Sequence, residues 1–142
     1  GWKTKNIDRV KITGFDLRWE RRAENGFGGD LTYTWLNRED WNPDTGYVKN
    51  TRLGEHRIAI GVTFTRGPWQ ARACWQLVAG RTPQLGQAMP DYHLLDTAII
   101  YRTRNGYDLK LAVNNLLDTA YEINAGYPMS GRNLEVSIYH VF

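Results

Sequence analysis

Hydrophobic and polar side chains alternate along the last ten residues of the chain. One parity is apolar and consists of Leu134, Val136, Ile138 and Phe142. The other parity carries Glu135, Ser137 and Tyr139. Successive side chains of a strand point to opposite faces, so this pattern predicts a strand with one apolar face. The edge of such a strand needs a pairing partner, which a closed barrel supplies.

The same alternation predicts six further strands. They lie at residues 10–20, 31–35, 58–64, 69–77, 95–101 and 107–113. In the first of them the apolar parity changes at Gly14, which predicts a bulge or bend at that residue. Beyond it, Asp16, Arg18 and Glu20 share the face opposite the apolar one, so we expect a charged ladder on that face.

Short and long connections alternate between the predicted strands. The short ones are glycine-containing turns at residues 25–29, 66–68 and 104–106. The long ones are polar segments at residues 37–55, 80–92 and 114–132, without apolar periodicity. Bacterial outer-membrane barrels place short turns on the periplasmic side and long loops outside the cell. The pattern therefore predicts an all-β fold, an antiparallel transmembrane up-and-down β-barrel, with residues 1–142 as one structural unit.

The strand count indicates a larger barrel, because seven strands are predicted and single-chain bacterial barrels have even numbers. Residues 1–9 would then be the descending limb of a further extracellular loop. Aromatic residues make up 13% of the chain, although the mean hydropathy is only −0.55. A membrane barrel explains both values, since its outer band is apolar and flanked by aromatic residues while its interior is polar. Four aromatic residues are predicted to flank the band, namely Trp35, Trp75, Tyr101 and Tyr107.

Several function classes find no support in the residues. The 18 basic and 15 acidic side chains are interspersed, so no basic patch for nucleic acid is predicted. Cys74 is the single cysteine and can form no disulfide within the chain. Motifs for nucleophilic catalysis, phosphate binding and helix-borne metal sites are missing. We therefore expect neither an enzyme, nor a cofactor, nor a resident metal site.

Two segments near the end of the chain carry a family resemblance. Residues 114–122 read NNLLDTAYE and residues 126–133 read GYPMSGRN, followed by the terminal strand that ends at Phe142. In this order and spacing they resemble the carboxyl end of TonB-dependent outer-membrane receptors. The stretch NIDRVKITGFDLRWE at residues 6–20 and the strand entry at residues 56–58 are similar to that family as well. Two positions depart from its pattern: Ser130 stands where proline is common, and His140 stands where an outward apolar residue is expected.

The resemblance implies a role in nutrient uptake at the bacterial outer membrane. Members of the family capture a scarce nutrient, such as a ferric siderophore, haem or a cobalamin, and import it through a plugged barrel of 22 strands. The expected partners are membrane lipid, upstream strands and plug of the same receptor, and the TonB protein, which acts through an amino-terminal part outside these residues. The barrel-assembly machinery would read the terminal strand, with Tyr139 and Phe142 as its assembly signal.

The long segments supply the candidate ligand-binding residues. Aromatic and arginine side chains together can form a rim for an anionic, flat or metal-chelating small molecule. The candidates are Trp41, Tyr47, Arg52, Arg81, Tyr92, Tyr121, Tyr127 and Arg132. Among the histidines, only His56 and His93 are expected at this extracellular rim.

Two other interpretations remain open at this stage. In the first, residues 1–9 supply an eighth strand and the chain closes into a small autonomous membrane barrel with a structural or adhesive role. In the second, the chain is a soluble up-and-down barrel that carries a ligand, with the apolar parity pointing inward. The pairing partner of the last strand distinguishes a small autonomous barrel from a segment of a receptor. Dependence on detergent distinguishes a soluble carrier from both membrane proteins.

Overall fold

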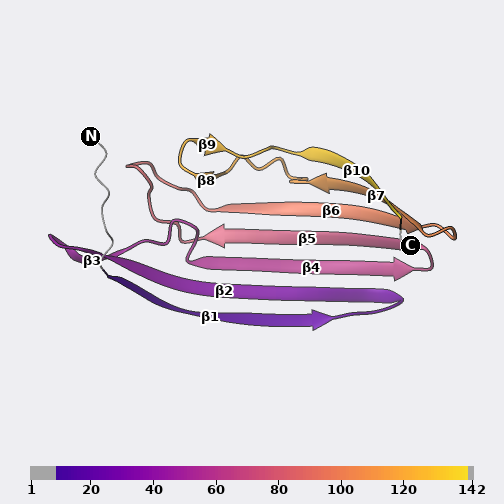
Figure 1. Cartoon of the computed structure of the whole chain (residues 1–142), viewed down its shortest axis with the longest axis horizontal. Coiled ribbons are helices and arrows are strands. Elements are labelled where there is room, and N and C mark those ends of the chain that lie inside the picture. Colours follow the sequence, from indigo (N-terminus) through magenta and orange to yellow (C-terminus); the bar gives the residue numbers. More distant parts are fainter. Residues whose placement is uncertain (1–8, 141–142) are drawn as a thin grey trace.

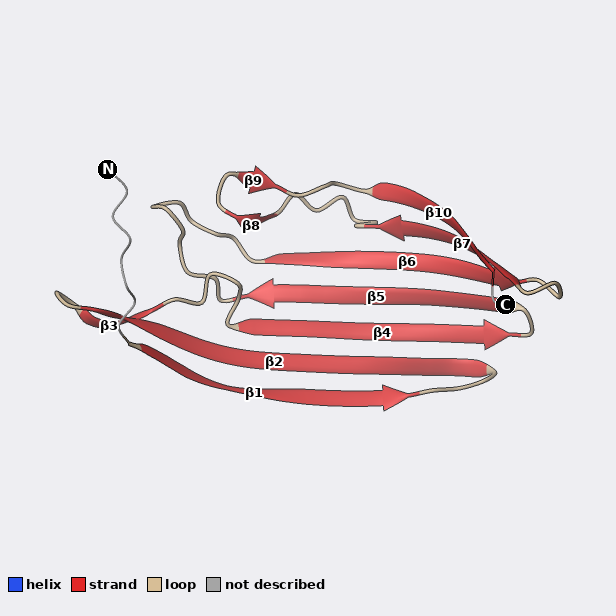
Figure 2. Ribbon diagram, viewed as in Figure 1, coloured by secondary structure: helices blue, strands red, loops and turns tan. Residues whose placement is uncertain are grey.

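The computed structural model describes residues 9–140, and these residues form β-strands joined by turns and loops (Figures 1 and 2). The strands are β1 (Val10–Arg21), β2 (Gly26–Asn42), β3 (Gly46–Lys49), β4 (His56–Arg66), β5 (Trp69–Ala79), β6 (Tyr92–Arg102), β7 (Tyr107–Asn114), β8 (Glu122–Asn124), β9 (Tyr127–Pro128) and β10 (Asn133–His140). Within these residues the structure contains no helix of the length and apolarity needed to cross a membrane.

One antiparallel sheet contains most of the strands. Its order is β1-β2-β4-β5-β6-β7-β10, and β3 pairs with the far end of β2. The seven strands on this path are the seven that the alternation predicts. They lie side by side in a single layer, with the three longer connections at one end and the short turns at the other (Figure 1). We call these the loop end and the turn end.

The two faces of the sheet differ in polarity. On the apolar face, large side chains stand in the open, as the exposed fractions of Val136 (71%), Ile138 (69%) and Phe27 (68%) show. Only three hydrophobic residues of the described chain are buried, namely Met89, Ala112 and Ala125. A soluble domain of this size would bury many more, because apolar burial is its main source of stability. The sheet is therefore a wall without a hydrophobic core of its own.

The polar face is covered by charge pairs and hydrogen bonds between strands, some of which reach across the strand in between. Arg72 Nη2 lies 2.9 Å from Asp30 Oδ1, and Lys110 Nζ lies 2.9 Å from Glu135 Oε1. Asp30 extends over Gly61, where a Cβ atom would collide with the carboxylate. The register places Asp16, Arg18 and Glu20 on this face, which confirms the predicted ladder.

The predicted bulge at Gly14 is wrong. β1 pairs with β2 in one unbroken register from Val10↔Asp40 to Arg21↔Gly29. Val10 and Ile12 therefore lie on the same side as Asp16, while Lys11 lies on the other side, 3.9 Å from Glu39. The polarity of the two faces reverses near the loop end, and the backbone stays regular. Gly14 allows close contact instead, because a Cβ atom there would collide with the Trp35 carbonyl oxygen.

The connections are shorter than the sequence pattern predicts. Within residues 37–55, β2 continues to Asn42 and pairs with β3 around a turn at residues 43–45. The first turn also contracts, since β2 already begins at Gly26. Tyr92 is the first residue of β6, not a loop residue. Two predictions lie outside the described residues: the assembly role of Phe142, and the structure of residues 1–8 as a loop limb or eighth strand.

Aromatic pairs gather toward both ends of the apolar face. At the turn end, Phe27 contacts Phe64 and Trp69 contacts Tyr101, with ring centroids 4.8 and 4.6 Å apart. At the loop end, Phe15 contacts Trp35 with centroids 5.9 Å apart. From Phe27 to Trp35, β2 rises about 26 Å at roughly 3.3 Å per residue.

Two of the four predicted flanking residues, Tyr101 and Tyr107, lie at strand ends, and Trp35 lies within β2 opposite His56, the first residue of β4. The prediction for Trp75 is wrong, because it pairs with Ile60 and Leu95 in the interior of the strands. It therefore belongs to the band and not to its border.

Candidate ligand-binding site

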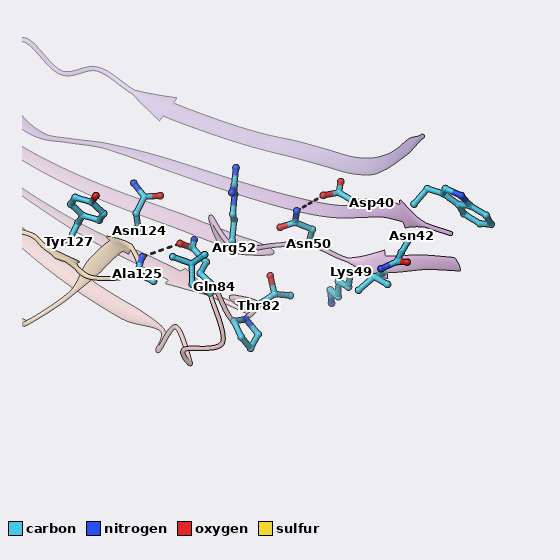
Figure 3. Close-up of a pocket in the computed structure, with 14 residues that line it drawn as sticks. Asp40, Asn42, Lys49, Asn50, Arg52, Thr82, Gln84, Asn124, Ala125 and Tyr127 are labelled. Atoms are coloured by element: carbon cyan, nitrogen blue, oxygen red, sulfur yellow. Dashed lines mark hydrogen bonds between the residues drawn. The ribbon is translucent and has the colours of Figure 1, made fainter. Parts of the chain in front are cut away.

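A cavity of about 780 Å³ opens among the long connections at the loop end (Figure 3). The extended β2–β3 hairpin, the loop before β6 and the segment around β8 and β9 contribute to it. Its lining residues are Asp40, Trp41, Asn42, Val48, Lys49, Asn50, Arg52, Thr82, Pro83, Gln84, Leu85, Asn124, Ala125 and Tyr127. This volume lies within the range of about 300–1,000 Å³ that is usual for small-molecule sites.

Arg81 holds the three long connections together. Its guanidinium donates to the carbonyl oxygens of Arg52 (3.1 Å), Pro90 (3.2 Å) and Ile123 (2.8 Å). The five donors of a guanidinium lie in a fixed plane, so this side chain can bind several carbonyls at once. Arg81 therefore links loops that are far apart in sequence.

Two tyrosines extend this link. The Arg81 guanidinium carbon lies 5.3 Å from the centroid of the Tyr92 ring, and the rings of Tyr92 and Tyr121 are 4.7 Å apart. Further bonds join the same loops, from Thr51 Oγ1 to the Gly80 carbonyl (2.8 Å) and from the Ala125 amide to Gln84 Oε1 (3.0 Å). The loops that surround the cavity are thus linked by contacts within the protein.

The three long connections at the loop end are together called the loop layer, and the NNLLDTAYE segment forms a compact turn at its edge. Asn115 is 4% exposed and has a left-handed backbone, with φ = 51°. Its side chain accepts from the Thr119 amide and donates to the Thr119 carbonyl, both at 2.9 Å. Asp118, with φ = 55°, accepts from the Arg132 amide at 2.8 Å. Asparagine and aspartate tolerate this backbone better than other side chains do, which explains the residue types in the segment.

The charges around the cavity are paired, with one exception. Arg38 Nε lies 2.9 Å from Asp40 Oδ1, and Asn50 donates to the other Asp40 oxygen. Lys49 Nζ lies 2.5 Å from Glu55 Oε2. The Arg52 guanidinium makes no ion pair or hydrogen bond with any residue that the structure describes. It stands between the Asp40–Asn50 pair and the Asn124–Ala125 segment in the view of Figure 3.

The ion pair of Glu55 also affects its titration. The hydrogen bond from Lys49 lowers the pKa of the Glu55 carboxyl below its ordinary value, against a smaller opposing effect of desolvation. A second hydrogen bond, from Trp35 Nε1 at 3.2 Å, lowers that pKa further. Glu55 therefore joins the wall to the loop end as a charged group over the neutral pH range.

The structure separates the eight predicted ligand-binding residues into three groups. Trp41, Arg52 and Tyr127 line the cavity, and Tyr47 packs edge-on against Trp41 with ring centroids 5.1 Å apart. The second group is Arg81, Tyr92 and Tyr121, which contact one another and the loop backbone. Arg132 lies outside the cavity lining, 4.0 Å from Asp118. A ligand contact by any of the eight stays a prediction.

Several residues of the cavity were not predicted, among them Gln84, Leu85, Asn50 and Asn124. The signal for Leu85 was a short Gln-Leu-Gly-Gln segment with turn chemistry at Gly86. The amide side chains carried no such signal, because asparagine and glutamine are ordinary loop residues. Tyr139, the predicted assembly residue, lies on the polar face opposite Asp108, and its role stays a prediction.

Metal-ligating side chains do not cluster in residues 9–140: no group of three His, Cys, Asp or Glu side chains is placed to hold a metal ion there. His56 contacts Tyr33 on the apolar face, with His56 Nδ1 2.9 Å from the Tyr33 hydroxyl. The described cavity thus presents amide, hydroxyl, aromatic and aliphatic groups together with the charged side chains of Asp40, Lys49 and Arg52.

Comparison with known proteins identifies the wall. The model of the TonB-dependent receptor-like β-barrel family matches residues 1–116. The chain belongs to this family. The match covers most of the wall and confirms both the resemblance and the all-β barrel class. The match ends at residue 116, within the NNLLDTAYE segment. The last strand of this TonB-dependent receptor-like barrel, β10, is therefore assigned from the structure and not from the family model.

A solved structure has the same fold. The copper transporter OprC superimposes with a TM-score of 0.73 at 18% sequence identity, over 91% of this chain and 23% of OprC. The chain of this TonB-dependent receptor-like barrel thus spans about a quarter of the length of that transporter. At this identity the likeness shows the fold alone. No curated protein sequence matches the chain.

Proposed function

We propose that these residues form an arc of the wall of an outer-membrane receptor that binds a scarce nutrient outside the cell and imports it. One observation carries this proposal. A single-layer sheet exposes its large apolar side chains on one face, while charge pairs cover the other. Lipid is the solvent that fits such an apolar face, and a water-filled or plugged interior fits the polar face.

The aromatic borders support the same assignment. The band between Phe27 and Trp35 is about 26 Å long along β2, and the tilt of the strands would shorten it across the membrane. Transmembrane barrels carry an apolar band about 25 Å tall, flanked by aromatic residues. The loop end would then face the outside of the cell, and the turn end the periplasm.

The ligand of the proposed receptor would enter at the loop-end cavity. The candidates are a ferric siderophore, haem or a cobalamin, and the copper transporter OprC adds copper as a further one. Because the described cavity lacks a cluster of metal-ligating side chains, a metal would be recognised here through its organic chelator. Import would further require a plug, TonB and prior insertion by the barrel-assembly machinery.

The two other interpretations receive less support. A soluble carrier would need its apolar face turned inward and covered, whereas the described sheet is open and extended. An autonomous barrel with an eighth strand from residues 1–9 would need that strand to join β1 to β10, and residues 1–8 lie outside the described part of the chain. In residues 9–140, β1 pairs with β2 and β10 pairs with β7, and the two edges do not meet.

Accessibility of single cysteines across the membrane tests the proposal. In a Cys74→Ser background, Val62→Cys and Thr63→Cys place a thiol on the apolar and polar faces of the same strand. The receptor that contains these residues, inserted in phosphocholine vesicles, is labelled with a fluorophore at each site. We expect a lipid-borne quencher to quench the label at 62 and a water-soluble quencher to act on the label at 63. A reversed or equal pattern would contradict the wall assignment.

Uptake in cells tests the transport step. Accumulation of radiolabelled ferric siderophore, haem, cobalamin and copper is compared between cells with and without the receptor, each in the presence and absence of TonB. Accumulation of one compound that requires both proteins is the expected result. Accumulation that is independent of TonB would contradict active import, even if the wall assignment holds.

A further inference from the structure

The turn at residues 84–87 has an unusual residue at its tip. Gln84 and Gln87 exchange two backbone hydrogen bonds, of 2.9 and 2.8 Å, and so enclose a two-residue hairpin turn. Leu85 and Gly86 both have positive φ, at 50° and 78°. Turns of this kind favour asparagine or glycine at both positions, because a Cβ atom is strained in the left-handed region. Leucine is a poor choice here on conformational grounds.

The environment of Leu85 does not compensate for this strain. Its side chain is 93% exposed, the largest exposed fraction of any large hydrophobic residue in the described chain. An exposed leucine gains little from burial, so neither backbone preference nor packing explains it. It nevertheless borders the cavity. Strained residues recur at the ligand sites of proteins, so the strain at Leu85 points to a function.

The neighbouring residue presents a second unmet requirement. Gln84 Oε1 accepts from the Ala125 amide, but Gln84 Nε2 is buried and has no partner among the described residues. A buried donor without an acceptor destabilises a protein, so such groups usually bond to something. Gln84 lines the cavity, so a small shift of its side chain would bring this donor to a ligand oxygen.

The third requirement is electrostatic. Arg38 forms an ion pair with Asp40, and Lys49 forms one with Glu55. The Arg52 guanidinium attracts Asp40 at longer range but makes no ion pair or hydrogen bond within the described residues, so its donors remain available to a ligand. A guanidinium recognises a carboxylate through two parallel hydrogen bonds. The aromatic ring of Tyr127, which is 72% exposed, adds a further apolar surface to the same lining.

We propose that this cavity binds an organic carboxylate with an apolar face. Arg52 pairs with the carboxylate, Gln84 Nε2 donates to a second oxygen, and Leu85 packs against the apolar face. The inference rests on the proposed function, because it assigns a ligand chemistry to the same extracellular site. Such a ligand would account for three unfavourable features at this turn, namely the backbone strain at Leu85, the exposure of the Leu85 side chain and the unpaired amide donor of Gln84.

A matched pair of probes tests the charge requirement. Indole-3-acetate and indole-3-acetamide have the same apolar ring and nearly the same size, and differ in the carboxylate. Equilibrium dialysis against the vesicle-inserted receptor gives a dissociation constant for each. We expect the acetate to bind about tenfold more tightly than the amide, as one charge-assisted contact would produce. Arg52→Gln should abolish that difference, whereas Arg104→Gln in a turn at the opposite end should preserve it.

Leu85→Asn separates a ligand contact from a structural role. Asparagine before Gly86 is the preferred sequence for this turn, so the variant should slow hydrogen exchange at the Gln87 amide. Binding of both probes should nevertheless weaken about fivefold, because the apolar contact is lost. A purely structural leucine would leave binding unchanged or improve it.

Two results would overturn the inference: equal affinities of the two probes in the unmodified receptor, or unchanged binding in Leu85→Asn. The cysteine-accessibility experiment is run on the same vesicles. If the labels at residues 62 and 63 show the expected quenching pattern but the two probes bind equally well, only the proposed ligand chemistry is wrong. If that pattern itself is missing, the wall assignment and this inference fail together.

Discussion

The wall and the loop layer of this protein are held together in different ways. In the wall, each strand is paired along its length, and the apolar side chains stand outward with little contact to the rest of the chain. In the loop layer, single side chains such as Arg81 and Asn115 bind the backbone of several segments. The wall therefore depends on its solvent, and the loop layer depends on a few particular residues.

The largest expected effect is on the wall. Ile60→Arg places a charge on the apolar face in the interior of β4, and Ala59→Arg places the same charge on the polar face of the same strand. An arginine at the bilayer midplane of a barrel costs about 2–4 kcal/mol. We expect this loss in the free energy of unfolding for Ile60→Arg, measured by guanidinium titration in phosphocholine vesicles. The Ala59→Arg variant should lose less than about 1 kcal/mol, and equal losses would contradict the assignment of the faces.

A smaller and local effect is expected in the loop layer. Arg81→Lys keeps the charge but cannot bind the carbonyls of Arg52, Pro90 and Ile123 together. Because hydrogen bonds from charged groups contribute about 1.5–3 kcal/mol each, we expect local opening of the loops to become easier by about 3 kcal/mol. Hydrogen exchange should accelerate in residues 50–55, 80–91 and 122–128.

The strands serve as the internal reference for that experiment. Exchange within β4 and β5 should be unchanged in Arg81→Lys, because the wall has its own hydrogen bonds. Arg104→Lys, in the exposed turn before β7, is the matched control and should alter neither region. Faster exchange throughout the sheet would mean that the wall and the loop layer unfold as one unit.

The smallest effect is expected at Glu55, which joins the two regions. Its pKa is lowered in the folded protein, chiefly by the hydrogen bond from Lys49. The ionised carboxylate therefore stabilises the fold above its unfolded pKa, and this contribution is lost as the pH falls through the folded pKa. For a partly exposed pair we expect about 0.5 kcal/mol.

Unfolding at pH 6 and pH 3 in the unmodified receptor and in Glu55→Gln measures this contribution. The variant should be less stable at the higher pH and equal to the unmodified receptor at the lower one. If the two proteins differ equally at both values, the carboxylate charge is not the source of the stabilisation.

The strands of the wall were predictable because each one shows the alternation of apolar and polar residues within its own sequence. The alternation in residues 58–64 or 69–77 can be recognised without the rest of the chain, because in membrane barrels every strand has one face toward lipid and one toward the interior. The error at Gly14 has a physical cause as well. In membrane barrels the outer surface meets water beyond the aromatic border, and this explains why the polarity of the two faces changes while the strand continues.

The loop layer could not be predicted in the same way. The three carbonyls that Arg81 binds belong to residues up to 42 positions away in the sequence, and no local pattern marks such a contact. Aromatic and arginine residues correctly indicated where the cavity lies, since Trp41, Arg52 and Tyr127 line it. Composition alone gave no means to distinguish them from Arg81, Tyr92 and Tyr121, whose contacts are with the protein.

Gly61 shows how the wall sets the space in front of it. Because this position has no side chain, the Asp30 carboxylate lies flat over the backbone of β4 and meets Arg72 there. A methyl group at residue 61 would lift the carboxylate and its partner away from the sheet. Gly61 thus determines how far the polar side chains stand out from the sheet at this point. It thereby sets how close a group in front of the sheet can come to the wall.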